Sequence, residues 1–341
     1  MIRAALRRVS FEQIAIAFTV IVIAFLYFLA AGDALRNPKA TPDARESMKQ
    51  PAPATAFLPA KPAAHFAEKL TLLKRVSFSA DVIADVYASI GYKLDAVREH
   101  GQVPRVFMAN LPPDLSGIRA VERRKVMFIK TALPLILHVN ELIQHDRQRI
   151  EALHALSVAG VAIEAEDTAW LKAKAGEYGL DGVDFDALLR RVDFVPPSLA
   201  LAQSAEESGW GTSRFAVEGN ALFGQRIWRD SDGIVPHRRA EGERFRVAAF
   251  DHLIDGVKSY ARNLNSHAAY AAFRAARAAQ RRSHGMLDGY ELAGALSRYS
   301  ERGAAYVRSI RTIIRANALD VFDRAQLGDR MVTESVAAPD A

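Results

Sequence analysis

Residues 202–213 read AQSAEESGWGTS, and this stretch decides the fold because it holds the end of a helix and the turn after it. The helix is expected to begin at Pro197, since proline at the first helical position loses no hydrogen bond. Residues 199–206 are mostly good helix formers. The helix must end near residues 208–211, where two glycines flank a tryptophan. Glu207 is therefore expected on the last helical turn.

Glu207 has the features of a general acid. A carboxyl group at this end of a helix faces the negative pole of the helix dipole, and the indole of Trp210 would reduce its hydration. Both effects favour the protonated form, which is the form that a glycosidase needs in its acid. Glutamates at helix ends are also common on ordinary surfaces, so the pattern alone leaves both interpretations open.

A second block, NALFG at residues 220–224, follows at a short distance. Together the two blocks resemble the signature of the mannosyl-glycoprotein endo-β-N-acetylglucosaminidase family, which includes flagellar rod-associated peptidoglycan hydrolases. Within that family the chain is most similar to the bacterial Bax-type proteins. The similarity continues through residues 245–247, 259–267, 296–300 and 306, and residues 103–140 resemble the Bax accessory region.

The resemblance implies that Glu207 is the catalytic acid. It would protonate the oxygen of a β-1,4 bond between N-acetylglucosamine and N-acetylmuramic acid. Its neighbour Glu206 points about 100° away on a helix, which favours a structural role. Tyr299 and Tyr306 match the tyrosines near the carboxyl end of the family's domain. The first is implied to bind sugar, and Tyr306 is kept as a further candidate for substrate binding.

Two more aromatic residues, Trp210 and Phe223, are candidates either for sugar contact or for packing at the helix end. The residues after Tyr299 are Ser-Glu-Arg, whereas flagellar relatives have Ala-Thr-Asp there. The resemblance therefore assigns no acidic group at that position.

The second carboxylate is expected in a small β-lobe between Arg226 and Phe250, with a turn at residues 230–233 and a strand over 245–250. The lobe contains four acidic residues, Asp230, Asp232, Glu241 and Glu243, and the candidates kept are Glu241, Glu243 and Asp232. Two mechanisms stay open. A second carboxylate could activate water with inversion, or the substrate's own N-acetyl group could attack the anomeric carbon.

No metal or cofactor is expected. The chain has no cysteine, which excludes thiolate sites, disulfides and a cysteine nucleophile. Residues 230–233 (DSDG) resemble part of a calcium loop but lack the distal glutamate, and no zinc-binding spacing is present. The formal charge of +6 suits an anionic partner only weakly. Without aromatic interleaving or a recognisable module it does not indicate nucleic-acid binding.

The amino-terminal segment is expected to cross a membrane. Residues 14–31 (IAIAFTVIVIAFLYFLAA) are 18 uncharged residues, which as a helix span about 27 Å, close to the thickness of a bilayer core. This length exceeds the apolar region of most cleaved signal sequences, so an uncleaved anchor is favoured, although cleavage near residue 31 stays open. Arg3, Arg7 and Arg8 precede the span and would stay in the cytoplasm.

The predicted architecture is mainly α, with a lysozyme-like glucosaminidase domain and a small β-lobe. Its parts are a membrane anchor (1–36), a Pro/Ala-rich linker (37–65), a helical accessory region (66–175), the glucosaminidase domain (176–325) and a flexible tail (326–341). Pro134 is expected to kink or restart its helix. The catalytic domain would lie in the periplasm, held by the inner membrane, with peptidoglycan strands as its partner.

Two alternatives remain from the sequence. The first is a lytic transglycosylase or muramidase, since Glu-Ser-Gly at a helix end occurs in those enzymes too. The second is a non-catalytic scaffold that binds the cell wall.

Overall fold

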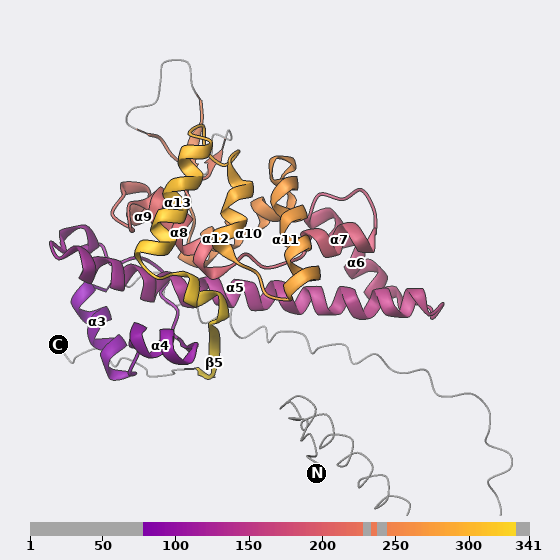
Figure 1. The fold of residues 1–341 in the computed structure, drawn as a ribbon, viewed down its shortest axis with the longest axis horizontal. Helices are drawn as coiled ribbons and strands as arrows, with labels where there is room; N and C mark the ends of the chain where they lie inside the picture. The colour runs from indigo at the N-terminus through magenta and orange to yellow at the C-terminus, as the bar shows by residue number, and fades with distance from the viewer. Residues whose placement is uncertain (1–77, 228–232, 237–243, 332–341) are drawn as a thin grey trace, which may run out of the picture. The chain divides into compact units, whose positions relative to one another are not determined.

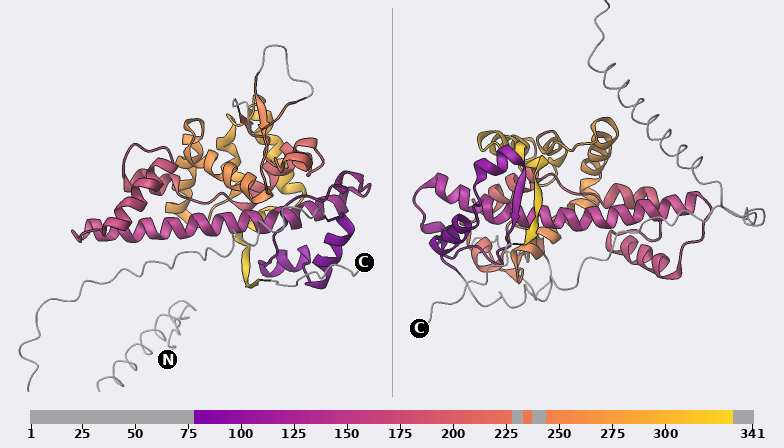
Figure 2. Two further views of the ribbon diagram at one scale, coloured as in Figure 1. Left: turned by 180° about the vertical axis from the view of Figure 1, so that it is seen from behind. Right: turned by 90° about the horizontal axis from the view of Figure 1, so that it is seen from below.

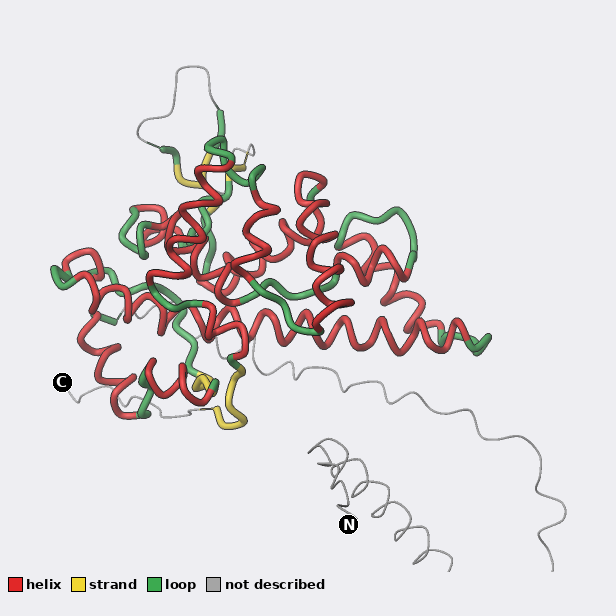
Figure 3. The backbone as a smooth tube through the Cα atoms, in the orientation of Figure 1, coloured by secondary structure: helices red, strands yellow, loops and turns green. Residues whose placement is uncertain are grey.

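Helices make up most of the described chain, which comprises residues 78–227, 233–236 and 244–331 of the computed structural model (Figure 3). The α-helices are α3 (Ala80–Ser89), α4 (Leu94–His100), α5 (Val121–Val158), α6 (Ala165–Glu177), α7 (Phe185–Arg191), α8 (Pro197–Ser208), α9 (Arg214–Gly219), α10 (Leu253–Ser266), α11 (Ala271–His284), α12 (Gly289–Leu292) and α13 (Ala304–Ala316). Short 3-10 helices are η2 (Leu115–Gly117), η3 (Ala268–Tyr270), η4 (Ala293–Leu296) and η5 (Asp320–Arg324). The strands are β1 (Gln102–Arg105), β2 (Arg226–Ile227), β3 (Gly233–Ile234), β4 (Arg246–Ala248) and β5 (Gln326–Met331).

Helix α5 is the long support against which much of the remaining fold packs (Figures 1 and 2). It contacts α7, α8, α10, β1 and β5. The helix continues through Pro134, so the expected restart at this residue was wrong. Leu133 and Leu135 on either side are completely buried. We attribute the continuity to this packing, which compensates for the backbone hydrogen bond that proline removes.

Among the described helices, α5 also has the length and apolar composition that a membrane span requires. However, 67% of its most apolar stretch is buried inside the protein, which is typical of a core helix. The predicted anchor at residues 14–31 and the linker at 37–65 lie outside the described residues.

Strands β1 and β5 join the two ends of the described chain. They pair in parallel, with Gln102 opposite Gln326. Arg105 strengthens the junction, since its Nε donates to the carbonyl of Gly328 at 2.7 Å and its two terminal nitrogens bind Glu141 at 2.9 and 2.7 Å. The flexible tail expected from residue 326 therefore starts with an ordered strand.

One apolar core crosses the boundary expected at residue 175. It contains Phe128 and Leu133 from α5 together with Leu199 from α8 and Ile310 from α13. The accessory region and the glucosaminidase domain consequently share a single core, which differs from the two separate parts inferred from the sequence.

The β-lobe is a three-stranded antiparallel sheet in the order β2-β4-β3. The sequence predicted a hairpin turning at residues 230–233, but β2 and β3 each pair with β4 and not with each other. The second-acid candidates Asp232, Glu241 and Glu243 lie outside the described residues, as does Asp230.

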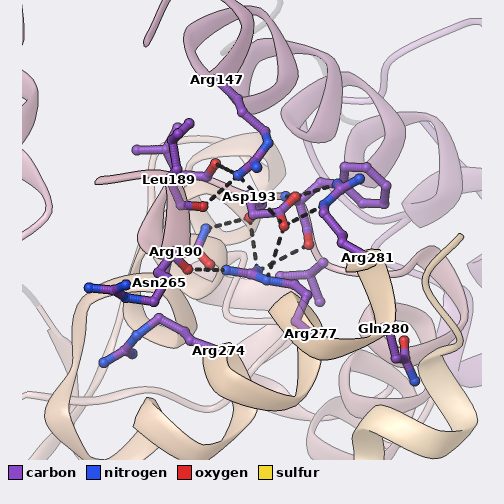
Figure 4. A network of polar contacts seen from close by, with 12 residues as sticks. Arg147, Leu189, Arg190, Asp193, Asn265, Arg274, Arg277, Gln280 and Arg281 are labelled. Carbon is purple, nitrogen blue, oxygen red and sulfur yellow. Dashed lines mark hydrogen bonds and ion pairs between the residues drawn. The ribbon is translucent and has the colours of Figure 1, made fainter. Parts of the chain in front are cut away.

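A buried cluster of charges holds the loop that leads into α8 (Figure 4). Asp193 in this loop pairs with Arg281 and lies 3.6 Å from the Nε of Arg277 and 3.9 Å from Arg147. Arg277, with no exposed surface, also donates to the carbonyls of Asp193 and Phe194 at 2.9 and 3.1 Å. Burial lowers its pKa to about 10. Because unpaired buried charges are costly, these contacts fix the start of α8.

Candidate active site

Helix α8 is almost entirely buried, and it contacts α5, α12, α13 and η5. It begins at Pro197, as predicted. Asp323 caps it by accepting hydrogen bonds from the backbone N and the hydroxyl of Ser198, both at 2.8 Å, while also accepting from the backbone N of Gly289 at 3.0 Å. The helix that carries Glu207 is therefore fixed at its start by the carboxyl-terminal segment.

The Ser-Gly-Trp-Gly turn ends α8 immediately after Glu207. Gly209, Trp210 and Gly211 have positive φ angles of 59°, 58° and 78°. Residues other than glycine rarely adopt this backbone conformation. The hydroxyl of Ser208 accepts from the backbone N of Gly211 at 2.8 Å. A Cβ on Gly211 would lie 2.9 to 3.0 Å from Leu111, Leu115 and Phe128, so the turn is pressed against the accessory region.

This turn directs Trp210 towards α5. The indole packs edge-on to Phe128, with ring centroids 5.8 Å apart, and the Nζ of Lys125 lies 5.3 Å from the ring centre. Of the two roles considered for Trp210, these contacts support packing at the helix end.

Glu207 is half-buried and lies beside Gly224 and Tyr306. A Cβ on Gly224 would lie only 3.4 Å from Oε2 of Glu207, so a larger residue there would cover the carboxyl group. Burial raises the pKa of Glu207, and the negative charge of Glu206 raises it further. A hydrogen bond with Tyr306 and the positive charges of Arg302 and Arg226 oppose this effect on the pKa.

Aromatic rings gather around Glu207. Tyr299 stacks on Tyr306 with ring centroids 5.4 Å apart and donates to the carbonyl of Phe223 at 3.3 Å. Phe223 in turn stacks on Tyr260 at 3.8 Å, and Tyr270 lies 5.8 Å from Tyr299. The structure thus brings together three of the four predicted aromatic residues, which are Phe223, Tyr299 and Tyr306. Phe223 and Tyr306 are only 3% and 1% exposed, so their burial supports packing and not the sugar contact that was expected of them.

Glu206 has different partners from Glu207, and they are structural contacts. It pairs with Arg302 at 2.5 Å and accepts from the hydroxyl of Ser309 at 3.0 Å. This contact ties the loop that carries Tyr299 and the start of α13 to the end of α8.

Several residues near Glu207 were not singled out from the sequence. Gln203 is fully buried and bridges Tyr260 and Tyr306, since Tyr260 donates to its Oε1 at 2.7 Å and its Nε2 donates to Tyr306 at 2.9 Å. Gln203 lies four residues before Glu207, and this spacing places both on one helix face. That spacing was the available signal. Tyr260 lies in the stretch 259–267 that resembles the family, although no role was assigned to it, and nothing local indicated Tyr270.

Within the described residues, no group of three His, Asp or Glu side chains is arranged to hold a metal ion. A surface cavity of about 390 Å³ lies near α3 and the start of α5, lined by Asp81, Asp114, Arg119 and Arg123 among others. None of the predicted site residues lines it.

Comparisons with known proteins bear on the same segment. A family model described as mannosyl-glycoprotein endo-beta-N-acetylglucosaminidase matches residues 184–319. Protein bax of Escherichia coli strain K12 is 31% identical over 200 residues, which cover 57% of this chain and 70% of that protein. Among solved structures, the catalytic domain of the autolysin Auto from Listeria monocytogenes is 16% identical, with a TM-score of 0.30, over 50% of this chain and 96% of that one.

Proposed function

The chain belongs to the mannosyl-glycoprotein endo-β-N-acetylglucosaminidase family as a Bax-type member, and from this premise we propose that it hydrolyses peptidoglycan. It cleaves the β-1,4 bond between N-acetylglucosamine and N-acetylmuramic acid, with Glu207 as general acid. The observation that carries the proposal is the setting of Glu207. Its carboxyl group is half-buried at the end of α8, hydrogen-bonded to Tyr306, with a raised pKa, inside the segment that matches the family.

The chemistry follows from these contacts. A raised pKa keeps the proton on Glu207 at a pH where an ordinary glutamate has lost it. When the glycosidic bond breaks, Glu207 gives this proton to the leaving oxygen and becomes a carboxylate. The hydroxyl of Tyr306 and the charges of Arg302 and Arg226 then stabilise the negative charge. The same groups that oppose the raised pKa therefore help the proton leave.

Two routes remain for the attack on the anomeric carbon. An inverting route needs a second carboxylate to activate water, and Asp232, Glu241 and Glu243 are its candidates. A substrate-assisted route uses the N-acetyl oxygen of the sugar and needs no second acid for the first step. Proton NMR of the first-formed anomer distinguishes them, because inversion gives the α-anomer and assistance gives the β-anomer.

The test of the activity is to digest purified peptidoglycan with residues 56–341, which form one compact unit. Mass spectrometry after borohydride reduction should find new reducing N-acetylglucosamine ends. Glu207→Gln should remove nearly all activity, whereas the matched control Glu218→Gln, on an exposed residue of α9, should keep it. Anhydromuramic ends would identify a lytic transglycosylase, and reducing muramic ends a muramidase. Equal clearing by Glu207→Gln would refute the role of Glu207, and no clearing by the wild type would point to a scaffold.

We also propose that residues 14–31 anchor the chain in the inner membrane with the catalytic part in the periplasm. The support is the run of 18 uncharged residues behind three arginines. The full chain should sediment with membranes and be digested by protease added to spheroplasts. A version without residues 1–36 that still sediments with membranes would contradict the proposal.

A further inference from the structure

We propose that Gln203 is a positioning residue that makes the hydroxyl of Tyr306 donate its hydrogen to Glu207. This inference rests on the proposed role of Glu207 as general acid. Gln203 does not itself reach the substrate, because its side chain is completely buried. It acts by setting the direction in which the hydroxyl hydrogen of Tyr306 points.

The direction follows from counting donors and acceptors along the chain of contacts. Tyr260 donates to Oε1 of Gln203 at 2.7 Å, Nε2 of Gln203 donates to the oxygen of Tyr306 at 2.9 Å, and Tyr306 hydrogen-bonds Glu207. An ionised carboxylate only accepts, and a tyrosine hydroxyl has a single hydrogen. With the amide donating to its oxygen, Tyr306 keeps that hydrogen for Glu207.

The opposite orientation of the amide would defeat this arrangement. If Oε1 faced Tyr306, the tyrosine would donate to the amide, and its hydrogen would no longer be available to Glu207. The orientation with Nε2 towards Tyr306 is the one that satisfies every group once Glu207 has lost its proton. Gln203 therefore favours the state of Glu207 that forms as the glycosidic bond breaks, which is how a residue accelerates a reaction.

Packing, and not the amide, fixes the two tyrosine rings. Tyr306 stacks on Tyr299 with an angle of 9° between the rings, and Tyr260 stacks on Phe223 with an angle of 7°. The positions of both hydroxyl oxygens are thus set by their rings. Removing the amide should leave these oxygens in place and make the hydroxyl of Tyr306 a weaker donor, because hydrogen bonds in a chain polarise one another.

The experiment compares full-length protein, in detergent, carrying Gln203→Met with the wild type. Methionine has a similar length and no strong hydrogen-bonding group. We expect kcat on soluble glycan strands to fall about 10- to 100-fold, the effect of losing a hydrogen bond to a developing charge, while KM changes little. The basic limb of the pH profile of kcat should also move to higher pH, because Tyr306 no longer receives the N–H of Gln203 and stabilises the ionised form of Glu207 less.

Two further variants separate positioning from structure. Ser204→Ala is the matched control, since Ser204 is equally buried on α8 and its hydroxyl binds only the carbonyl of Leu201 at 2.9 Å among its described contacts. It should destabilise the fold without moving the basic limb. In a Tyr306→Phe background, Gln203→Met should cause no additional shift of that limb.

The outcomes are distinct. The inference is wrong if Gln203→Met lowers kcat but, like Ser204→Ala, leaves the basic limb in place. It is also wrong if Gln203→Met shifts the limb by the same amount in the Tyr306→Phe background as in the wild type. Should Gln203→Met fail to fold, Tyr260→Phe takes its place. It frees Oε1 to accept from Tyr306, so a smaller shift in the same direction is expected, and no shift refutes the inference. Wild-type protein without activity, or a fully active Glu207→Gln, would overturn the proposed function instead.

Discussion

Replacing Gly211 by alanine tests whether the end of α8 is packed on the accessory region. The new Cβ would lie 2.9 Å from carbon atoms of Leu115 and Phe128 and 3.0 Å from Leu111. These three side chains are at most 2% exposed, so they have little room to move. Overpacking of this kind costs about 1–3 kcal/mol. The φ angle of 78° adds about 1–2 kcal/mol for an L-residue. The expected loss is about 2–5 kcal/mol.

Gly160 offers a matched control. Its φ angle is 70°, and a Cβ there would meet nothing within 4 Å. Gly160→Ala should therefore cost only the backbone strain of about 1–2 kcal/mol. The difference between the two variants, about 1–3 kcal/mol, isolates the packing of the turn against the accessory region.

Urea unfolding of residues 56–341, followed by circular dichroism, measures both losses at equilibrium. In thermal unfolding, each kcal/mol should lower the melting temperature by about 2–4 °C for a protein of this size. Equal losses of unfolding free energy for the two variants, with the slope of that free energy against urea concentration unchanged, would refute the packing of Gly211 against Leu111, Leu115 and Phe128.

Three further results are expected. Because burial raises the pKa of Glu207 above its ordinary 4.5, the folded state holds this proton more tightly than the unfolded state. The resulting cost to stability grows as pH rises from 4.5 through the raised pKa. Glu207→Gln should thus stabilise the protein at pH 7 but not at pH 4, which the midpoints of urea unfolding at the two pH values measure. Asp323→Ala should cost about 1–3 kcal/mol of unfolding free energy in the same assay, since it leaves the buried Ser198 donors without their acceptor. A fragment of residues 176–325 should show a poorly dispersed proton NMR spectrum, because it lacks α5, and a well-dispersed spectrum would contradict the shared core.

Local patterns predicted the elements whose causes are local. The start of α8 follows from Pro197, its end follows from the glycines at 209 and 211, and the position of Glu207 follows from both. The backbone conformation that turns Trp210 towards α5 was not predictable, because it depends on three consecutive positive φ angles. The second block of the signature, residues 220–224, follows the first in the sequence, and the structure places its Gly224 beside Glu207.

Contacts between distant segments were beyond these patterns. Nothing in Gln326–Met331 indicates that its partner is Gln102–Arg105, because a parallel pair across so many residues is selected by the whole fold. For the same reason the boundary at residue 175 separated elements that share one core. Pro134 is similar, since the burial of its neighbours, and not its own preference, determines that α5 continues.

The chemistry of the site depends on α13 as much as on the signature in α8. Tyr306 and Ser309 are three residues apart in α13, which places them on one side of that helix, and Arg302 lies in the turn just before it. Arg302 and Ser309 bind Glu206, while Tyr306 between them binds Glu207. Two identical side chains, adjacent in the sequence, thus meet different partners from α13 and from the turn before it. Glu206 is held by an arginine and a serine. Glu207 is hydrogen-bonded to a tyrosine, and burial raises its pKa. We therefore attribute the different settings of the two glutamates to the residue of α13, or of the turn before it, that each one faces.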